Sequence, residues 1–176
     1  MLGRLFLVLL FMFDTGAAPN SNIVAPLYAT EPIRVLVFTT TDCPISNRYA
    51  PEINRLAEKY TGKATFVLVY PVAADSPEMI RAHQRKYGYS LESIRDTAHH
   101  LLTQTGVTVT PEVAVMAGGR MVYRGRIDDR YVALGTERPQ PTRRDLEAAL
   151  DAVIAGKPVP QRETRAVGCI IADLIK

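Results

Sequence analysis

Apolar and polar residues are arranged along this chain so that strands and helices alternate. Residues 33–40 form an apolar, β-branched run, which predicts a strand buried on both faces. From Pro44 onward, apolar residues recur every three or four positions, which predicts one face of a helix. A strand therefore leads directly into a helix, with Cys43 at the junction.

The same alternation continues through the first half of the chain. Residues 64–70 predict a second buried strand, and Ser76 with Pro77 predicts the capped start of a second helix. Asp96 is expected to cap a shorter third helix that Gly106 ends. Because this order is β-α-β-α, it predicts a parallel sheet.

The second half of the chain has a different pattern. Residues 112–116 and 121–127 are strand-like runs separated by two glycines, which predicts a β-hairpin. Residues 128–141 are polar and contain proline, so they are expected to form a loop. The fold class predicted is therefore α/β, with a central mixed sheet flanked by helices. Its parallel βαβ half is completed by the C-terminal hairpin.

The last helix is expected to begin at a capping box formed by Thr142 and Asp145, with Asp at the usual Glu position, and to end at Gly156. Residues 158–176 contain two prolines and no clear period. They are therefore expected to form a tail laid over a single domain of residues 19–157.

The amino terminus has the pattern of a secretory signal peptide. Arg4 precedes an apolar run over residues 5–13, and small residues follow up to Ala17 and Ala18. The run is too short to span a bilayer, which takes about 20 residues. Residues 1–18 are thus predicted to be cleaved near Ala17 or Ala18. The mature protein is then expected to be periplasmic or secreted, without stable membrane insertion. The alternatives are an apolar strand and an uncleaved anchor.

Composition limits the classes of partner. The chain has 176 residues, 47% of them hydrophobic, and a net charge of +3. This fits one globular domain and predicts no nucleic-acid partner. His83 and the His99-His100 pair fall on predicted helices without other ligands nearby, so neither a metal nor another cofactor is predicted.

Cys43 is the candidate reactive group. The first-turn N–H groups and the positive end of a helix dipole favour a thiolate, so such thiols have pKa values of roughly 3.5 to 7.5 instead of about 8.5. Cys43 is therefore a candidate nucleophile toward disulfides or peroxides, the alternative being a small buried apolar residue. The hypothesis requires Cys43 to be accessible to solvent.

The residues around Cys43 resemble a known family. Residues 38–46 read FTTTDCPIS, which resembles the active-site turn of the thioredoxin-like superfamily, especially its secreted redoxin group (AhpC/TSA and TlpA-like). Pro51 stands where thioredoxins kink this helix, and Thr110-Pro111 resembles their cis-proline loop. The resemblance covers about residues 33–156. It implies a thioredoxin-like fold and a thiol-disulfide oxidoreductase, whose partners are protein thiols or disulfides and an external reductant or oxidant.

The same resemblance implies a substrate groove formed by Pro44, Thr110 and Pro111. A cis bond between Thr110 and Pro111 would turn the backbone sharply beside Cys43 and leave strand-edge groups free to pair with an extended substrate. The alternative is an ordinary trans proline at the start of a strand.

The chain departs from the family at Ser46, because the usual Cys-x-x-Cys reads Cys-Pro-Ile-Ser. Ser46 cannot resolve a mixed disulfide, although it could donate a hydrogen bond to the Cys43 thiolate. Cys169, 126 residues later, is the other cysteine and the candidate resolving thiol. Gly168 would permit a close backbone approach there. The alternatives are an isolated thiol and an intermolecular disulfide.

A thiol peroxidase is the first alternative function. Thr40 and Cys43 satisfy the Thr-x-x-Cys part of the peroxiredoxin motif, which makes Thr40 a candidate catalytic residue. However, Leu36 replaces the proline that begins that motif, and the activating arginine would have to be Arg124 or Arg126 of the next strand. A copper-binding Sco-like protein and a non-catalytic chaperone module are further alternatives.

Two other features have open interpretations. Residues 126–131 are densely charged and predict a loop held by Arg–Asp pairs, with a substrate or partner rim near Cys43 as the alternative. Glu112 either relays a proton or faces solvent.

Overall fold

The structure, a computed structural model, describes residues 32–172. The expected signal peptide over residues 1–18 and the expected start of the domain at residue 19 lie outside the described residues. No helix in the described part of the chain is long and apolar enough to cross a membrane.

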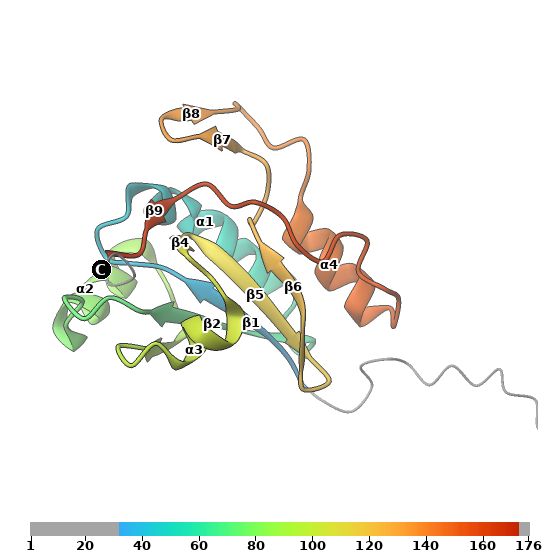
Figure 1. Cartoon of the computed structure of the whole chain (residues 1–176), viewed down its shortest axis with the longest axis horizontal. Coiled ribbons are helices and arrows are strands. Elements are labelled where there is room, and N and C mark those ends of the chain that lie inside the picture. Colours follow the sequence, from blue (N-terminus) through green and yellow to red (C-terminus); the bar gives the residue numbers. More distant parts are fainter. Residues whose placement is uncertain (1–31, 173–176) are drawn as a thin grey trace, which may run out of the picture.

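A five-stranded mixed sheet forms the centre of the fold (Figure 1). In spatial order the strands are β3 (Glu92–Arg95), β2 (Ala64–Tyr70), β1 (Ile33–Phe38), β5 (Glu112–Ala117) and β6 (Arg120–Gly125). β1 pairs in parallel with β2, and β2 pairs in parallel with β3. On its other side β1 pairs antiparallel with β5, which pairs antiparallel with β6. This confirms the predicted parallel half and C-terminal hairpin, while β3 was not predicted.

The central strand β1 is buried on both faces because its side chains alternate between two hydrophobic clusters. The helices around the sheet are α1 (Pro44–Lys59), α2 (Pro77–Tyr87), α3 (His100–Thr105) and α4 (Asp145–Ile154). Val35 and Val37 belong to the larger cluster, which includes residues of α1, α2 and α4. Leu36 and Phe38 belong to the smaller cluster, which includes residues of α3.

Most helix starts and ends follow the predicted signals. The Ser76 side chain accepts the Met79 N–H at the start of α2, and Gly88 ends that helix with positive φ. The Asp96 carboxylate caps α3 from further upstream than an ordinary N-cap, accepting the N–H groups of His100, Leu101 and Leu102.

The predicted capping box at the start of α4 is wrong. Thr142 donates its backbone N–H and its hydroxyl to Asp129, so it does not cap the helix. Asp145 instead forms ion pairs with Arg126 and Arg143. The helix has no side-chain cap, because the tertiary partner Asp129 outcompetes the local one.

Short strands occur where no periodic pattern predicted them. Residues 128–141, expected as a loop, contain a small hairpin of β7 (Tyr131–Ala133) and β8 (Thr136–Glu137). After α4 the tail runs back across the domain, past β6, and reaches the start of α1 (Figure 1). Its β9 (Cys169–Ile170) pairs antiparallel with β4 (Val109–Thr110).

The tail packs as part of the domain. Val159 and Val167 lie against the larger cluster, and Ile171 is buried in the smaller one. The division into a domain up to residue 157 and a tail of residues 158–176 stays a prediction.

Candidate active site

Cys43 is the residue that caps α1. Its backbone is extended, Pro44 follows in the first turn, and its Sγ accepts the backbone N–H of Ser46 at 3.5 Å. The sulfur thus lies against the N–H groups at the positive end of a 16-residue helix. This position favours a thiolate over a thiol.

The second cysteine lies against the first. Cys43 Sγ is 2.8 Å from Cys169 Sγ, and both cysteines are free thiols in this structure. When it is protonated, Cys43 can donate to the Thr110 carbonyl oxygen, 3.1 Å away. Two residues 126 positions apart in the sequence therefore form one thiol pair.

The surroundings separate the pKa values of the two thiols. Burial raises the pKa of Cys43, but hydrogen bonding from Cys169 and then from Ser46 outweighs burial, so the net pKa is below its ordinary value. Burial, together with its hydrogen bond and proximity to Cys43, raises the pKa of Cys169 to about 12. Cys43 is therefore the cysteine of the pair that ionises first, and its thiolate accepts a hydrogen bond from the Cys169 thiol.

The proline loop lies beside this pair, as predicted. The Thr110-Pro111 bond is cis, and Thr110 pairs with Cys169 in the β4–β9 ladder. The strand edge that was expected to be free for a substrate is consequently occupied by the chain's own tail.

Gly168 makes this close approach sterically feasible. A Cβ on residue 168 would lie 2.1 Å from the Thr110 carbonyl oxygen and 2.6 Å from its carbonyl carbon. Only glycine fits against the backbone in this arrangement. This agrees with the predicted role of Gly168 in letting the tail approach.

Cys43 does not meet the expectation of solvent access, because its exposed fraction is 2%. Thr110 and Cys169 are among the groups that contact its sulfur. In this conformation Cys169 contacts the Cys43 sulfur, whereas an external molecule cannot reach that sulfur because other groups cover it.

Comparison with known proteins identifies the fold. No protein-family model and no curated protein matches the chain. A solved structure of an uncharacterized conserved protein from Geobacillus kaustophilus has a TM-score of 0.69 and 27% identity, covering 80% of this chain and 76% of that one. A hypothetical protein from Sinorhizobium meliloti has a TM-score of 0.69 and 26% identity, with 80% and 79% covered.

A third solved structure carries a descriptive name. A thioredoxin-like protein in its oxidized form matches with a TM-score of 0.54 and 18% identity, covering 72% of this chain and 80% of that one. The chain has a thioredoxin-like fold. The fold predicted from the sequence is thereby confirmed.

Within this thioredoxin-like fold, the predicted site residues Ser46 and Thr40 are both buried. The Ser46 amide contacts the Cys43 sulfur, while the Ser46 hydroxyl is buried without a hydrogen-bond partner among the described residues. Thr40 is buried, but no hydrogen bond within residues 32–172 joins it to Cys43. The Thr110 hydroxyl is likewise buried and unpaired in this part of the chain.

Sequence reasoning missed the residues that hold the turn before Cys43. The Thr41 hydroxyl and amide both donate to the Asp75 carboxylate, which lies in the loop before α2. Asn47 donates to the Thr41 carbonyl, and its own oxygen accepts from His83 Nε2 at 2.7 Å. No local signal marks these contacts, because their partners come from separate elements.

His83 is a packing residue of this turn. Since its Nε2 donates to the Asn47 oxygen, its Nδ1 accepts from the Tyr70 hydroxyl at 2.8 Å. Burial lowers its pKa, which favours the neutral ring. No group of three His, Cys, Asp or Glu side chains that could hold a metal occurs among the described residues.

The charged segment of residues 126–131 lies partly beside the site, and its use as a substrate or partner rim stays a prediction. Asp128 accepts from the Tyr49 hydroxyl and from the Arg130 backbone N–H, so hydrogen bonds hold this segment. Tyr131 also reaches the site, where it lines a hollow of about 350 Å³. The other residues around this hollow are Pro44, Ile45, Arg48, Leu134, Gly135, Glu137 and Cys169.

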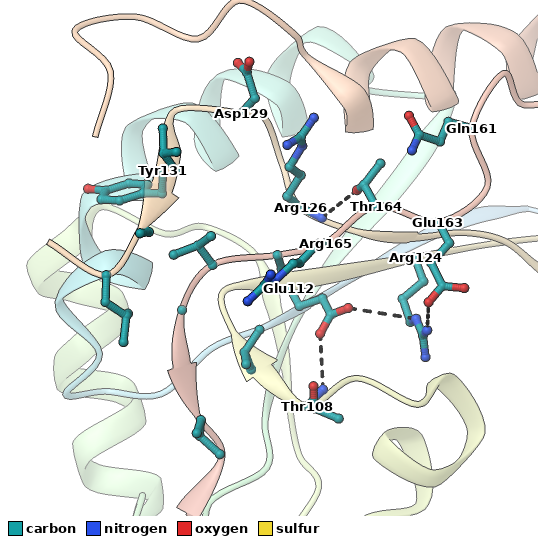
Figure 2. Close-up of a pocket in the computed structure, with 18 of the residues that line it drawn as sticks. Thr108, Glu112, Arg124, Arg126, Asp129, Tyr131, Gln161, Glu163, Thr164 and Arg165 are labelled. Carbon is teal, nitrogen blue, oxygen red and sulfur yellow. Dashed lines mark hydrogen bonds and ion pairs between the residues drawn. The ribbon is translucent and has the colours of Figure 1, made fainter. Parts of the chain in front are cut away.

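Glu112 and the two arginines of the peroxidase alternative line a second cavity, of about 1010 Å³, which residues of the tail also line (Figure 2). Glu112 is buried, accepts the Thr108 N–H and lies 3.9 Å from Arg124, so it does not face solvent. Burial raises its pKa. Arg124 pairs with Glu163, and Arg126 pairs with Asp145; neither contacts Cys43.

Proposed function

We propose that this thioredoxin-like chain is a thiol-disulfide oxidoreductase in which Cys43 is the nucleophile and Cys169 the resolving thiol. The observation that carries the proposal is the 2.8 Å contact between the two sulfurs, whose pKa values are shifted in opposite directions. A thiolate and a thiol held this close are prepared for exchange.

The first step is attack by the Cys43 thiolate on one sulfur of a substrate disulfide. A Cys43–substrate disulfide forms, and the other substrate sulfur leaves as a thiolate. Because Cys43 has then lost its negative charge, one cause of the raised Cys169 pKa disappears. Cys169 therefore loses its proton more readily at the stage at which it has to react.

In the second step, Cys169 gives its proton to the released substrate thiolate and attacks Cys43 Sγ. A Cys43–Cys169 disulfide forms, and the second substrate sulfur leaves as a thiolate that takes a proton from solvent, so that two electrons pass from the enzyme to the substrate. An external reductant returns the enzyme to its dithiol form. An external oxidant with reduced protein thiols would run the same steps in reverse.

The roles of the remaining site residues follow from this chemistry. Ser46 occupies the usual place of a second cysteine, so resolution passes to the tail, and its amide helps to stabilise the Cys43 thiolate. Pro44, Thr110 and Pro111 border the position where a substrate sulfur must approach. The absence of an arginine contact to Cys43 in the described residues gives the peroxidase alternative no structural support.

We further propose that the enzyme acts in the periplasm or outside the cell. The pattern of residues 1–18 supports a signal peptide cleaved near Ala17 or Ala18. Such a compartment also lets a disulfide between Cys43 and Cys169 persist. The partners of the enzyme are then the thiols and disulfides of secreted proteins.

Mass spectrometry under non-reducing conditions tests this mechanism. Incubation of the reduced protein with oxidised glutathione should convert the wild type to an internal disulfide, seen as the loss of two hydrogen atoms. Cys169→Ser should stop at a glutathione adduct on Cys43, and Cys43→Ser should form no internal disulfide. A stable glutathione adduct on the wild type, or rapid Cys43-dependent consumption of hydrogen peroxide, would contradict the proposal.

A further inference from the structure

The tail lies on β4 as an extended strand would. Cys169 pairs with Thr110 and Ile170 with Val109 in antiparallel register, and the Ile171 N–H donates to the Thr108 carbonyl at 3.2 Å. Main-chain contacts of this kind do not depend on which side chains the added strand carries.

The residue before Cys169 is selected by the backbone opposite to it. Gly168 lies so close to Thr110 that an added Cβ would overlap the Thr110 carbonyl group. The obstructing atoms belong to the backbone, so a side-chain movement cannot relieve the overlap. A strand that occupies this position with a cysteine opposite Cys43 therefore needs glycine immediately before that cysteine.

The two residues after Cys169 differ in their surroundings. Ile170 is 64% exposed and Ile171 is 1% exposed. Ile171 packs into the smaller hydrophobic cluster with Leu36, Phe38, Leu102, Val107 and Ala114. The site therefore selects an aliphatic side chain two positions after the cysteine and accepts any residue directly after it.

We propose that the edge of β4 is a docking site for a cysteine-bearing extended segment of the substrate protein, and that β9 is its built-in occupant. The substrate segment has the form Gly-Cys-x-aliphatic and pairs antiparallel to β4. The inference rests on the proposed function, since it names the substrate class of the same site. The covered state of Cys43 is a direct consequence, because an external segment has to displace β9 first.

The tail is built so that β9 can leave without the rest. The β4–β9 ladder is two residues long, whereas further upstream Thr164 and Arg162 are hydrogen-bonded to both backbone groups of Arg124. Tyr123 also contacts Thr164 through its hydroxyl. In the proposed open state, residues 165–172 detach and expose Val167 and Ile171, while residues 162–164 stay on β6.

Synthetic peptides with the sequence of residues 165–172, RAVGCIIA, test the inference on the full-length Cys169→Ser variant. The peptide cysteine carries thionitrobenzoate as a mixed disulfide. The Cys43 thiolate attacks the peptide sulfur, a Cys43–peptide disulfide forms, and thionitrobenzoate leaves as a coloured thiolate whose release gives the rate. All peptides have to displace the same tail, so the ratio of their rates reports how well each peptide fits the groove along β4.

Replacing the glycine of the peptide by alanine should slow release about tenfold or more, because the groove has no room for a Cβ. Replacing the aliphatic residue two positions after the cysteine by alanine should slow it by a similar factor. The matched control is alanine directly after the cysteine, which should leave the rate unchanged.

Equal rates for all four peptides would overturn the inference and leave the proposed function standing. Reaction of Cys43 with a small aromatic disulfide but with none of the peptides would overturn it too. If Cys43 in the folded variant reacts with neither the peptides nor the small disulfide, the proposed function itself fails.

Discussion

The two cysteines are held by very different parts of the molecule. Cys43 lies between β1, the central strand of the sheet, and α1, and the turn before it is held by Asp75 and Asn47. Cys169 lies on a two-residue strand, held by main-chain pairing and one buried side chain, Ile171. The proposed nucleophile is therefore fixed by the core, whereas the proposed resolving thiol lies on the segment that we propose detaches. This difference suits the proposed mechanism, in which the site opens for each substrate.

The largest expected effect concerns stability. Leu150→Ala, in the main core on α4, should lower the free energy of unfolding by about 3 kcal/mol. Ile171→Ala should lower it by about 1 kcal/mol, because the tail can detach without unfolding the sheet. Urea unfolding followed by circular dichroism measures both. Equal losses would mean that the tail and the core unfold as one unit.

The next effect is on access to Cys43. In the Cys169→Ser background, Gly168→Ala should displace the tail and raise the rate of Cys43 alkylation by a bulky maleimide about tenfold. The matched control is Ile170→Ala in the same background. Because Ile170 is exposed, this substitution should leave the rate of Cys43 alkylation unchanged. An unchanged rate in a folded Gly168→Ala variant would show that the tail is not what covers Cys43.

The smallest effect is on the titration of Cys43. The Cys169 thiol donates to the Cys43 thiolate and lowers its pKa, so the removal of this donor should raise it. The ultraviolet absorbance of the thiolate should therefore appear at higher pH in Cys169→Ala than in the wild type. Cys169→Ser retains a donor and should fall between them. A midpoint at lower pH in Cys169→Ala would contradict this arrangement of the proton.

Much of the sheet and its helices could be predicted because their signals are local. The apolar run of β1, the helical spacing after Pro44 and the cap at Ser76 each depend on a few neighbouring residues. The strands β3, β4, β7, β8 and β9 were missed, since two to four residues are too few to establish a period. The capping box at Thr142 failed because Asp129, distant in sequence, binds the same groups.

The sequence by itself determined the α/β class and the position of Cys43 at a helix start, because strand, helix and turn patterns are short-range, and its motifs implied the thioredoxin-like fold and the proline loop by resemblance. Only the tertiary structure decided that Cys169 lies 2.8 Å from Cys43, that β9 covers the groove and that Gly168 presses on Thr110. A contact across 126 residues depends on where the whole chain folds back, and no local pattern encodes that distance.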